Sequence, residues 1–497
     1  MASRATQSFV AGDREFDFTE DYIAYHAALN PSYIALIDND KKVTYAEFHR
    51  HLGGFIQAVG NFGMKVGDTA AIEWTSLYPQ WLLLLACESH GIATYSYVKS
   101  GPGKREDVLA GANLVICTEG HVPPAARRVQ LISSEWFDEV AALEPGQNRQ
   151  RPNLPPDTAL GIYFSSGTTG DAKRVVQVAR VHENRIFKSQ IRAGFNRQSR
   201  FLVWPTFVLQ GIYIFANACI RMGGTCIYEN TNNIAQPISR NDVTHISVVP
   251  SVLANLLDSL PNKFVKPKNL TVFTFGGPAS DALRARAASD LEATLIENYS
   301  TNEAGPIGTI GRDGEGVVFP GVEVEIVDDD HRPVIGEPGR VRVKSGGCID
   351  GYDGDPIATA KMFRDGWFYP GDVGIMRGPR SLKLLGRADD LMNLGGQKFN
   401  PDHFEEQLRR VISVEDFCVT ALPDAEELEQ LCIALVLNSS TSLEEMRDVI
   451  APVVSAHLGA FTLVKVQSIP RTSTGKAQRS KLKAQIAELQ ESSAEAG

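Results

Sequence analysis

The stretch YFSSGTTGDAK, residues 163–173, places glycines, serines and threonines between a short apolar run and a lysine. The run just before it, residues 160–164, is apolar and partly aromatic, which predicts a buried strand that ends at Ser165. Glycines let a backbone turn its N–H groups toward one centre, hydroxyls add donors, and Lys173 adds positive charge. Composition alone favours a flexible Ser/Gly connection, but the position directly after a strand favours a loop that binds the oxygens of a phosphate.

Two common sites built on such loops are excluded by spacing. A Walker loop requires G-x-x-x-x-G-K-[ST], whereas Gly170 is followed here by Asp171, Ala172 and then Lys173. A hydrolase elbow requires G-x-S-x-G, and neither Ser165 nor Ser166 stands in that pattern. The loop therefore indicates another nucleotide-binding architecture.

Length and charge limit the class of protein. A chain of 497 residues exceeds one typical hydrophobic core and predicts two to four domains. Its formal net charge of −10 argues against a general nucleic-acid binder, because phosphate contacts require an excess of Lys and Arg. We therefore expect small-molecule partners and no nucleic acid.

The cysteine pattern and the apolar runs indicate the cellular compartment of the protein. The seven cysteines are scattered without a C-x-x-C pair, which indicates neither a zinc site nor a disulfide framework. The first residues lack the apolar core of a signal peptide, and the strongest apolar run, 81–86, is far too short to span a bilayer. These patterns predict a cytoplasmic protein without an integral membrane segment.

The texture of the sequence changes twice along the chain. Strand-length apolar runs alternate with helical patterns through about residue 320, as in TVFTFGG (271–277) followed by a helix capped by Ser280. After Gly311, short alternating strands are broken by Gly, Pro and Asp. A new helix is predicted after Asn400, with Pro401 at its first position and an apolar face of Phe404, Leu408 and Val411, and the tail from 485 is predicted to fray. The predicted fold class is α/β, with a small β-rich subdomain and an α+β C-terminal part.

Five stretches occur in order along the chain: SSGTTGDAK (165–173), ENYSTNEAG (297–305), GWFYPGDVG (366–374), GRADDLMNLGGQKFNP (386–401) and RTSTGK (471–476). Together they resemble the adenylate-forming superfamily of acyl-CoA synthetases, peptide-synthetase adenylation domains and beetle luciferases. The resemblance implies a large N-terminal adenylation domain, 1–388, whose β-rich subdomain spans about 312–388. It also implies a smaller, mobile C-terminal domain, 389–497.

The resemblance implies ATP and Mg²⁺ in the large domain. An acceptor-only carboxylate such as Asp372 suits the two hydroxyls of a ribose. The same residue could instead be a turn aspartate that only hydrogen-bonds its own backbone. The family's matching glutamate, here Glu303, holds the magnesium and is assigned a catalytic role, and Tyr299 is expected to stack on adenine. The implied ATP-binding residues are Ser165, Ser166, Gly167, Thr168, Thr169, Gly170, Lys173, Gly276, Gly277, Pro278, Asn298, Tyr299, Ser300, Asn302, Asp372 and Arg387.

The C-terminal motifs imply a second set of residues. Lys476 is expected to enter the closed site and neutralise charge as the acid's carboxylate attacks the α-phosphate. Asp389 is expected to be the hinge about which the C-terminal domain rotates between two catalytic poses. Gly395 and Gly396 are then expected to let a slender acceptor thiol, of CoA or of a phosphopantetheine carrier, approach the acyl carbon.

The stretch WPTFVLQGIY, 204–213, corresponds to the acid-substrate pocket of the family. Trp204, Phe207, Val208 and Tyr213 predict an apolar, partly aromatic wall with Val208 at the gate, although the same residues could be ordinary core. Amino-acid-activating relatives place an aspartate in this segment, where this chain has Gln210, so a free amino acid is disfavoured. A dicarboxylate would require a cation, and 204–213 contains no Arg or Lys, so an aryl or medium-chain acid is preferred.

Three functions fit these motifs. The first is an AMP-forming ligase of a small carboxylic acid and CoA. The second is a stand-alone adenylation enzyme that transfers the acyl group to an acyl carrier protein or an amine, and the third is a catalytically silent member. Retention of Lys476, Glu303, Asp372 and Arg387 disfavours the third.

Overall fold

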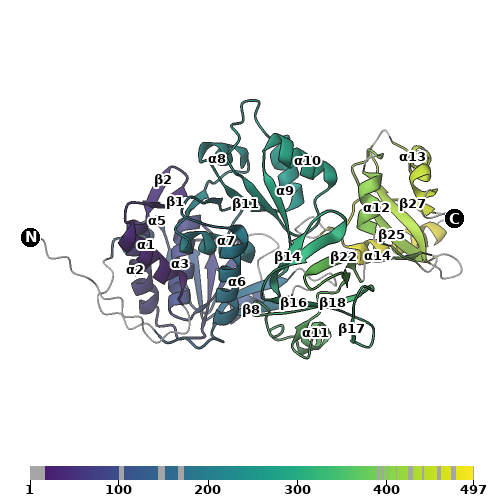
Figure 1. Ribbon diagram of the computed structural model, residues 1–497. Helices are drawn as coiled ribbons and strands as arrows, with labels where there is room; N and C mark the ends of the chain where they lie inside the picture. The colour runs from purple at the N-terminus through teal and green to yellow at the C-terminus, as the bar shows by residue number, and fades with distance from the viewer. Residues whose placement is uncertain are drawn as a thin grey trace, which may run out of the picture.

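The computed structural model of the protein describes residues 17–99, 106–143, 152–165, 173–388, 392–394, 397–399, 401–409, 411–423, 429–438, 441–455, 461–471 and 477–495. Figure 1 shows two sheet-and-helix layers in the first half of the chain, strands β14–β22 beside them, and the C-terminal elements at the right-hand end. The bounds of every element follow.

The first sheet has six strands in the order β6-β5-β3-β4-β7-β8. Its first five strands are parallel, and β8 returns antiparallel to β7 with Ser165 opposite Lys173. The strand predicted to end at Ser165 is confirmed, and residues 166–172 lie outside the described residues. The strands are β3 (Thr69–Glu73), β4 (Ala93–Tyr97), β5 (Leu114–Thr118), β6 (Val129–Ile132), β7 (Ala159–Ser165) and β8 (Lys173–Val178).

The second sheet has a parallel half followed by an antiparallel half. In the parallel half, β1, β10, β9, β11, β12 and β13 lie side by side, and β2 adds an antiparallel edge. Its strands are β1 (Ile34–Asp38), β2 (Lys41–Thr44), β9 (Arg200–Leu202), β10 (Thr225–Tyr228), β11 (His245–Val248), β12 (Thr271–Thr274) and β13 (Thr294–Thr301). Because β13 pairs parallel with β12 and antiparallel with β14, it joins the two halves.

The antiparallel half is the β-rich region expected after Gly311. It contains β14 (Gly305–Ile310), β15 (Glu315–Val318), β16 (Val322–Val327), β17 (Pro333–Val334), β18 (Gly339–Ser345), β19 (Phe363–Arg364), β20 (Trp367–Phe368), β21 (Asp372–Met376) and β22 (Ser381–Arg387). The alternating pattern read from the sequence is borne out in strands such as β18, where Val341 and Val343 are buried between exposed or half-buried neighbours.

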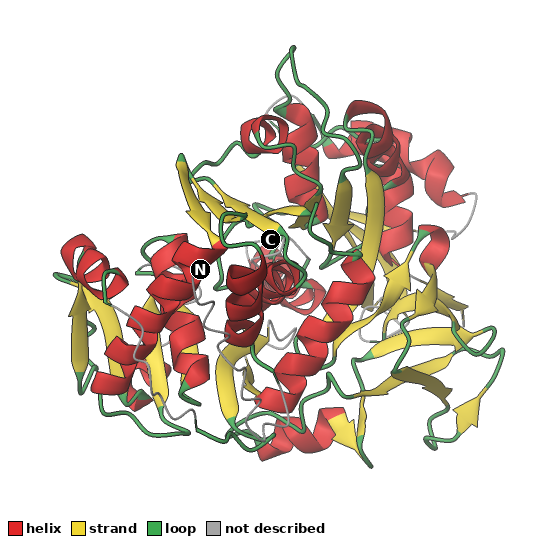
Figure 2. Cartoon of the chain, turned by 60° about the vertical axis from the view of Figure 1, so that its left-hand side comes forward, coloured by secondary structure: helices red, strands yellow, loops and turns green. Residues whose placement is uncertain are grey.

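The helices lie on both faces of the parallel strands (Figure 2). Apolar side chains of α2, α3 and α7 fill the core between the two sheets, whereas α8, α9 and α10 cover the opposite face of the second sheet. Ser280 caps α10 as expected, because its hydroxyl accepts from the N–H of Leu283 at 3.1 Å. The helices are α1 (Thr19–Leu29), α2 (Tyr45–Asn61), α3 (Leu77–Ser89), α4 (Glu106–Gly111), α5 (Ser134–Ala141), α6 (Ala179–Ala193), α7 (Gln210–Arg221), α8 (Ala235–Arg240), α9 (Pro250–Asp258), α10 (Asp281–Asp290), the 3₁₀ turn η1 (Arg312–Gly314) and α11 (Pro356–Met362).

The C-terminal elements have a core of their own. A three-stranded sheet in the order β25-β26-β27 packs with α12, α13 and α14, next to the short hairpin β23-β24. The elements are β23 (Met392–Leu394), β24 (Gln397–Phe399), α12 (Pro401–Leu408), β25 (Asp416–Pro423), β26 (Glu429–Val436), α13 (Leu443–Ser455), β27 (Phe461–Lys465) and α14 (Arg479–Glu495). The predicted α/β fold with an α+β C-terminal part is confirmed.

Two local expectations in this part were wrong. Phe404 and Leu408 are buried, but α12 ends at Leu408, so Val411 leaves the helical face and is 45% exposed. The tail was expected to fray from residue 485, whereas α14 continues to Glu495 because Leu482 and Ile486 anchor it in the core. The predicted cap Asn400 lies outside the described residues, and the boundary at 388/389 stays a prediction.

All seven cysteines are free thiols. In the part of the chain that the structure describes, no helix combines the length and the apolar character needed to cross a bilayer.

Candidate active site

A cavity of about 760 Å³ lies where α6, α7 and the carboxyl ends of β11–β13 meet the β-rich region. In open α/β sheets, ligands bind in the crevice outside the carboxyl ends of the strands. Several residues predicted from the motifs lie in its wall: Lys173, Val208, Gly276, Asn298, Ser300, Asn302, Glu303 and Arg387. The cavity therefore brings together side chains that are more than two hundred residues apart in the sequence.

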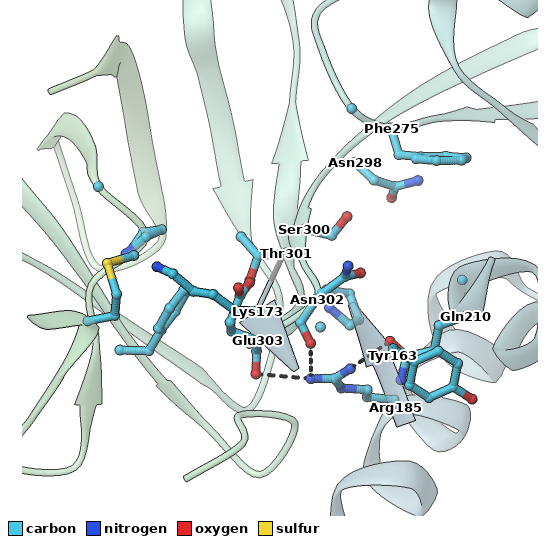
Figure 3. Close-up of a pocket in the computed structure, with 18 of the residues that line it drawn as sticks. Tyr163, Lys173, Arg185, Gln210, Phe275, Asn298, Ser300, Thr301, Asn302 and Glu303 are labelled. Atoms are coloured by element: carbon cyan, nitrogen blue, oxygen red, sulfur yellow. Dashed lines mark hydrogen bonds between the residues drawn. The ribbon is translucent and has the colours of Figure 1, made fainter. Parts of the chain in front are cut away.

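Glu303 is the acidic group of this wall. Its carboxylate accepts a hydrogen bond from the hydroxyl of Tyr352 at 2.9 Å, and Lys173 Nζ lies 4.9 Å from the centre of the same tyrosine ring. Burial, reinforced by the Glu303 carboxylate, raises the pKa of Tyr352, so the tyrosine remains a neutral donor. Figure 3 shows Lys173 and Glu303 together at one end of the cavity.

The donors at this end fit magnesium. Mg²⁺ is usually held by one or two carboxylates together with waters and substrate phosphates, not by an all-protein cage. Among the described residues that line the cavity, Glu303 is the one acid, and Tyr352 occupies only part of its acceptor capacity. In the described ranges, no cluster of three or more His, Cys, Asp or Glu occurs.

Asn302 connects this end to the predicted phosphate loop. Its side-chain amide donates to the carbonyl of Phe164 at 3.1 Å, one residue before the end of β7. Ser165 is the last residue of that strand, whereas Ser166, Gly167, Thr168, Thr169 and Gly170 lie outside the described residues. The strand end is thus fixed to the Glu303 turn, and the role of the loop stays a prediction.

Asp372, Tyr299 and Arg387 form a second polar group. The hydroxyl of Tyr299 donates to Asp372 at 2.5 Å, and Arg387, the cross-strand partner of Asp372, approaches it at 3.4 Å. Burial raises the pKa of Tyr299 well above its ordinary value, so it stays neutral. Arg387 lines the cavity and Asp372 does not, so the predicted contact of Asp372 with a ribose stays a prediction.

The glycine loop after β12 reaches the cavity at one residue. Gly276 lies in the wall with a positive φ of 86°, a conformation that favours glycine. Gly277 and Pro278 follow in the same exposed loop without lining the cavity. The contact of Gly276, Gly277 and Pro278 with adenine therefore stays a prediction, with only Gly276 in the cavity wall. Asp389, Gly395, Gly396 and Lys476 lie outside the described residues.

The predicted acid pocket needs correction. Of its four residues, Val208 alone lines the cavity. Phe207 is 1% exposed and packs against the rings of Trp81 and Tyr213, while the Tyr213 hydroxyl donates to Glu88 at 2.7 Å. Trp204 packs in the core beneath α8 and α9. Tyr213 lies on α7, and its ring packs with that of Phe207 in the core between the sheets, whereas Trp204 packs against the core on the other face of the second sheet.

Helix α6 supplies wall residues that the sequence analysis missed. Arg185, Ser189 and Arg192 all line the cavity, together with Phe215 and Phe275 from other elements. Residues 204–213 contain no Arg or Lys, as stated above, but α6 adds the cations Arg185 and Arg192 to the wall of the cavity. The spacing 185, 189, 192 places three polar side chains on one face of a helix, and this pattern was the signal available in the sequence.

Arg185 is held by the protein itself. It donates to the backbone carbonyls of Asn302 at 2.9 Å, Glu303 at 3.0 Å and Gly347 at 2.7 Å, and to the side-chain oxygen of Gln210 at 3.1 Å. Figure 3 shows these bonds between Arg185 and the Asn302–Glu303 turn. Arg185 therefore fixes the backbone that carries Glu303, and Gln210 serves as its neutral acceptor.

A family model described as "AMP-binding enzyme" matches residues 23–353, more than half of the chain. This chain belongs to the AMP-binding enzyme family. The resemblance stated from the five motifs is thereby confirmed.

Individual relatives of this AMP-binding enzyme share a quarter or less of their aligned residues with it. A 2-succinylbenzoate–CoA ligase of Listeria innocua is 25% identical over 93% of this chain and 98% of its own. A fatty acid–[acyl-carrier-protein] ligase, MmaC, of Mycobacterium marinum is 25% identical over 68% of this chain and 70% of its own. The solved O-succinylbenzoate coenzyme A synthetase MenE of Bacillus subtilis, in complex with ATP and magnesium, superimposes with a TM-score of 0.78 at 23% identity, covering 93% of this chain and 99% of MenE.

Proposed function

We propose that this enzyme is an AMP-forming ligase that joins an aryl or medium-chain carboxylic acid to CoA through an acyl-adenylate. The observation that carries the proposal is a single cavity with Glu303 and Lys173 at one end and the apolar residues Val208, Phe215 and Phe275 in its wall. Such a cavity can hold the reacting carboxylate beside phosphates while burying the rest of the acid. The relative from Listeria, whose name denotes a CoA ligase of an aryl acid, supports the same reaction class.

The first half-reaction forms the adenylate. A carboxylate oxygen of the acid attacks the α-phosphorus of ATP, the bond to the pyrophosphate oxygen breaks, and pyrophosphate leaves. Glu303 would hold Mg²⁺, which when bound neutralises charge on the phosphates. Lys173 and Arg387 place fixed positive charge on the cavity wall, and Lys476 is proposed to add a further cation in this pose.

The second half-reaction forms the thioester. The thiol sulfur of the acceptor attacks the acyl carbon, the bond to the adenylate oxygen breaks, and AMP leaves. Rotation about Asp389 is proposed to withdraw Lys476 and to bring Gly395 and Gly396 to the cavity. One cavity thus serves two reactions with the same acyl group.

A carrier protein is the second candidate acceptor. The mycobacterial relative is named as a ligase that acts on an acyl carrier protein, and a pantetheine arm presents the same thiol as CoA. The acyl-adenylate chemistry is identical in both cases, so only the acceptor distinguishes them.

The test is pyrophosphate release over a panel of aryl and aliphatic acids, followed by mass spectrometry of the products with CoA, with a holo-carrier protein, or with neither. We expect acid-dependent pyrophosphate release and an acyl-CoA product. An acyl-carrier product without acyl-CoA would select the second candidate, and the absence of acid-dependent release with every acid would overturn both.

A further inference from the structure

Arg192 contributes a positive charge to the cavity wall, and among the described residues no carboxylate forms an ion pair with it. It lies near the end of α6 and is half-buried, and burial alone lowers its pKa to about 9, so it remains charged at neutral pH. A guanidinium in such surroundings is normally paired, because a desolvated charge without a partner is costly.

The hydrogen bonds of Arg192 are few and long. Its two terminal nitrogens donate to Asn298 Oδ1 at 3.3 Å and to Ser189 Oγ at 3.4 Å, both neutral acceptors beyond the ordinary N–H···O distance. Its Nε is buried and has no acceptor. A guanidinium carries five N–H donors, so most of the capacity of Arg192 is unused.

Aromatic rings hold the guanidinium in place without satisfying it. Its central carbon lies 4.7 Å from the centre of the Phe215 ring and 5.7 Å from that of Phe319. Stacking on rings fixes the plane and leaves the N–H edges available, which is the arrangement that binds a carboxylate through two parallel hydrogen bonds.

Arg185 on the same helix provides an internal comparison. Five hydrogen bonds to carbonyl and amide oxygens of the protein satisfy Arg185, and its role is structural. Arg192 lies two turns farther along α6 and has no such set. The unused donors are therefore a property of this position and not of every arginine in the cavity.

The position of Arg192 relative to Glu303 indicates how far apart two carboxylates on the acid substrate would be. Arg185 contacts the Asn302–Glu303 turn, and Arg192 follows it by seven residues, which is a rise of about 10 Å along the helix axis. Asn298, which accepts a hydrogen bond from Arg192, also lies away from Glu303. Figure 3 shows it beside Phe275, on the other side of Ser300 and Thr301 from Glu303. Under the proposed function the activated carboxylate lies beside Glu303, so Arg192 faces the other end of the acid.

We propose that Arg192 binds a second carboxylate on the acid substrate, so that this enzyme selects dicarboxylic acids whose two carboxylates are about 10 Å apart or can approach that separation. The inference rests on the proposed function and names the substrate class of the same site. A monocarboxylic acid of equal size would leave Arg192 unpaired and cover it with apolar surface. We expect such an acid to react about 10- to 100-fold less efficiently in kcat/KM.

The test compares matched acids on matched variants. Each α,ω-dicarboxylate from glutarate to sebacate is paired with the monocarboxylate of the same chain length, and 2-succinylbenzoate is paired with 2-butanoylbenzoate. Acid-dependent ATP–pyrophosphate exchange is measured for the native enzyme, R192M, R192K and the control R197M. Arg197 follows the same helix but is exposed and stacks on Tyr33, away from the cavity.

We expect the native enzyme and R197M to prefer the diacid of at least one pair, mainly through a lower KM. R192M should lose that preference while it retains or improves turnover of the monoacid, and R192K should recover part of it. Equal loss of diacid and monoacid activity in R192M would show a general structural or catalytic role and would overturn the inference. An unchanged preference in R192M would also overturn it.

A second measurement is independent of the chemistry. Because Arg192 is desolvated without a carboxylate, ligand-free R192M should melt no lower than the native enzyme, and the preferred diacid should raise the melting temperature of the native enzyme but not of R192M. Stabilisation by diacids without exchange would refute the proposed ligase while supporting Arg192 as a carboxylate site. Neither exchange nor stabilisation with any acid would overturn both.

Discussion

At the scale of single residues, Glu303, the proposed magnesium ligand, is also a structural junction. Its backbone carbonyl accepts from Arg185 at 3.0 Å and from the N–H of Ile349 at 2.9 Å, while its side chain faces Tyr352. The backbone bonds fix the carboxylate in the cavity independently of its charge. A substitution that changes only the charge therefore separates chemistry from folding.

We predict that Glu303→Gln lowers acid-dependent ATP–pyrophosphate exchange on the order of 100-fold or more, because the metal-binding charge is removed. The amide oxygen can still accept from Tyr352, so the melting temperature should change little. Tyr352→Phe is the control, and it should reduce exchange much less. Near-native exchange in the glutamine variant would remove Glu303 from the magnesium site.

A second residue-scale feature is the buried acid Glu88 on α3. Its neighbours are the Tyr213 hydroxyl, His182 Nε2 at 3.4 Å, and the Glu183–Arg221 pair. Burial raises the pKa of Glu88 to about 8, partly opposed by the hydrogen bond from Tyr213. Burial also lowers the pKa of His182 to about 3, so this histidine stays neutral.

The folded state thus binds the Glu88 proton more tightly than the unfolded chain, and stability falls as the pH rises from the ordinary value of 4.5 toward 8. We predict that Glu88→Gln, which keeps an acceptor for Tyr213, is more stable than the native enzyme at pH 8 by on the order of a few kcal/mol. The advantage should shrink toward pH 4.5, as measured by urea unfolding across this range. A difference that does not vary with pH would show that Glu88 does not titrate in this window.

At the scale of elements, α6 and α7 are joined through Arg221, the last residue of α7. Its guanidinium binds both oxygens of Glu183 on α6, one at 2.8 Å, and donates to Thr19 of α1 at 2.9 Å. All three residues are buried. This junction holds the helix that carries Arg185 and Arg192 against the helix that begins at Gln210.

We predict that Arg221→Met destabilises the protein by roughly 3–5 kcal/mol, because it leaves the Glu183 carboxylate buried without its partner. The control is Arg240→Met, which breaks the ion pair between the exposed Arg240 and Glu229 and should destabilise the protein much less, because water solvates the arginine. Chemical denaturation of both variants measures the difference. Equal losses would show that the buried pair has no special role.

The elements also show where sequence reasoning was sufficient. The strand ending at Ser165, the Ser280 cap and the alternating strands after Gly311 were predictable, because each is set by local periodicity and turn chemistry. The acid end of the cavity was not, since no local pattern distinguishes Phe207, which is buried in the core, from Val208, which faces the cavity. That distinction depends on which helix packs behind the segment, and α6 comes from another part of the chain.

At the scale of the whole molecule, β13 unites the parallel and antiparallel halves of one continuous sheet. Its residues Asn298 and Ser300 line the cavity, and Glu303 follows in the turn to β14. One strand and its turn therefore contribute these three residues to the wall of the cavity. The C-terminal elements have a separate core, which suits a part that supplies different groups at different stages.

We predict that Lys476→Ala lowers adenylate formation strongly, while thioester formation from a supplied acyl-adenylate and CoA remains largely intact, because the lysine is proposed to face the cavity only in the first pose. Pyrophosphate exchange and thioester formation are assayed separately on the same variant. Equal loss of both half-reactions would refute the two-pose mechanism.

The proposed nucleotide residues on β13 and the proposed acid-binding residue on α6 belong to different elements, and this separation bears on how substrate specificity can evolve. Asn298, Ser300 and Glu303, three of the residues proposed for nucleotide and metal, lie along β13 and its turn. Arg192 projects instead from α6, which is held in place by Arg185 and the Glu183–Arg221 pair. Replacement of Arg192 by a neutral or acidic side chain during evolution would therefore change the acid substrate without changing the residues proposed for adenylation. For the same reason, position 192 is the first to randomise in a library designed to redirect the enzyme.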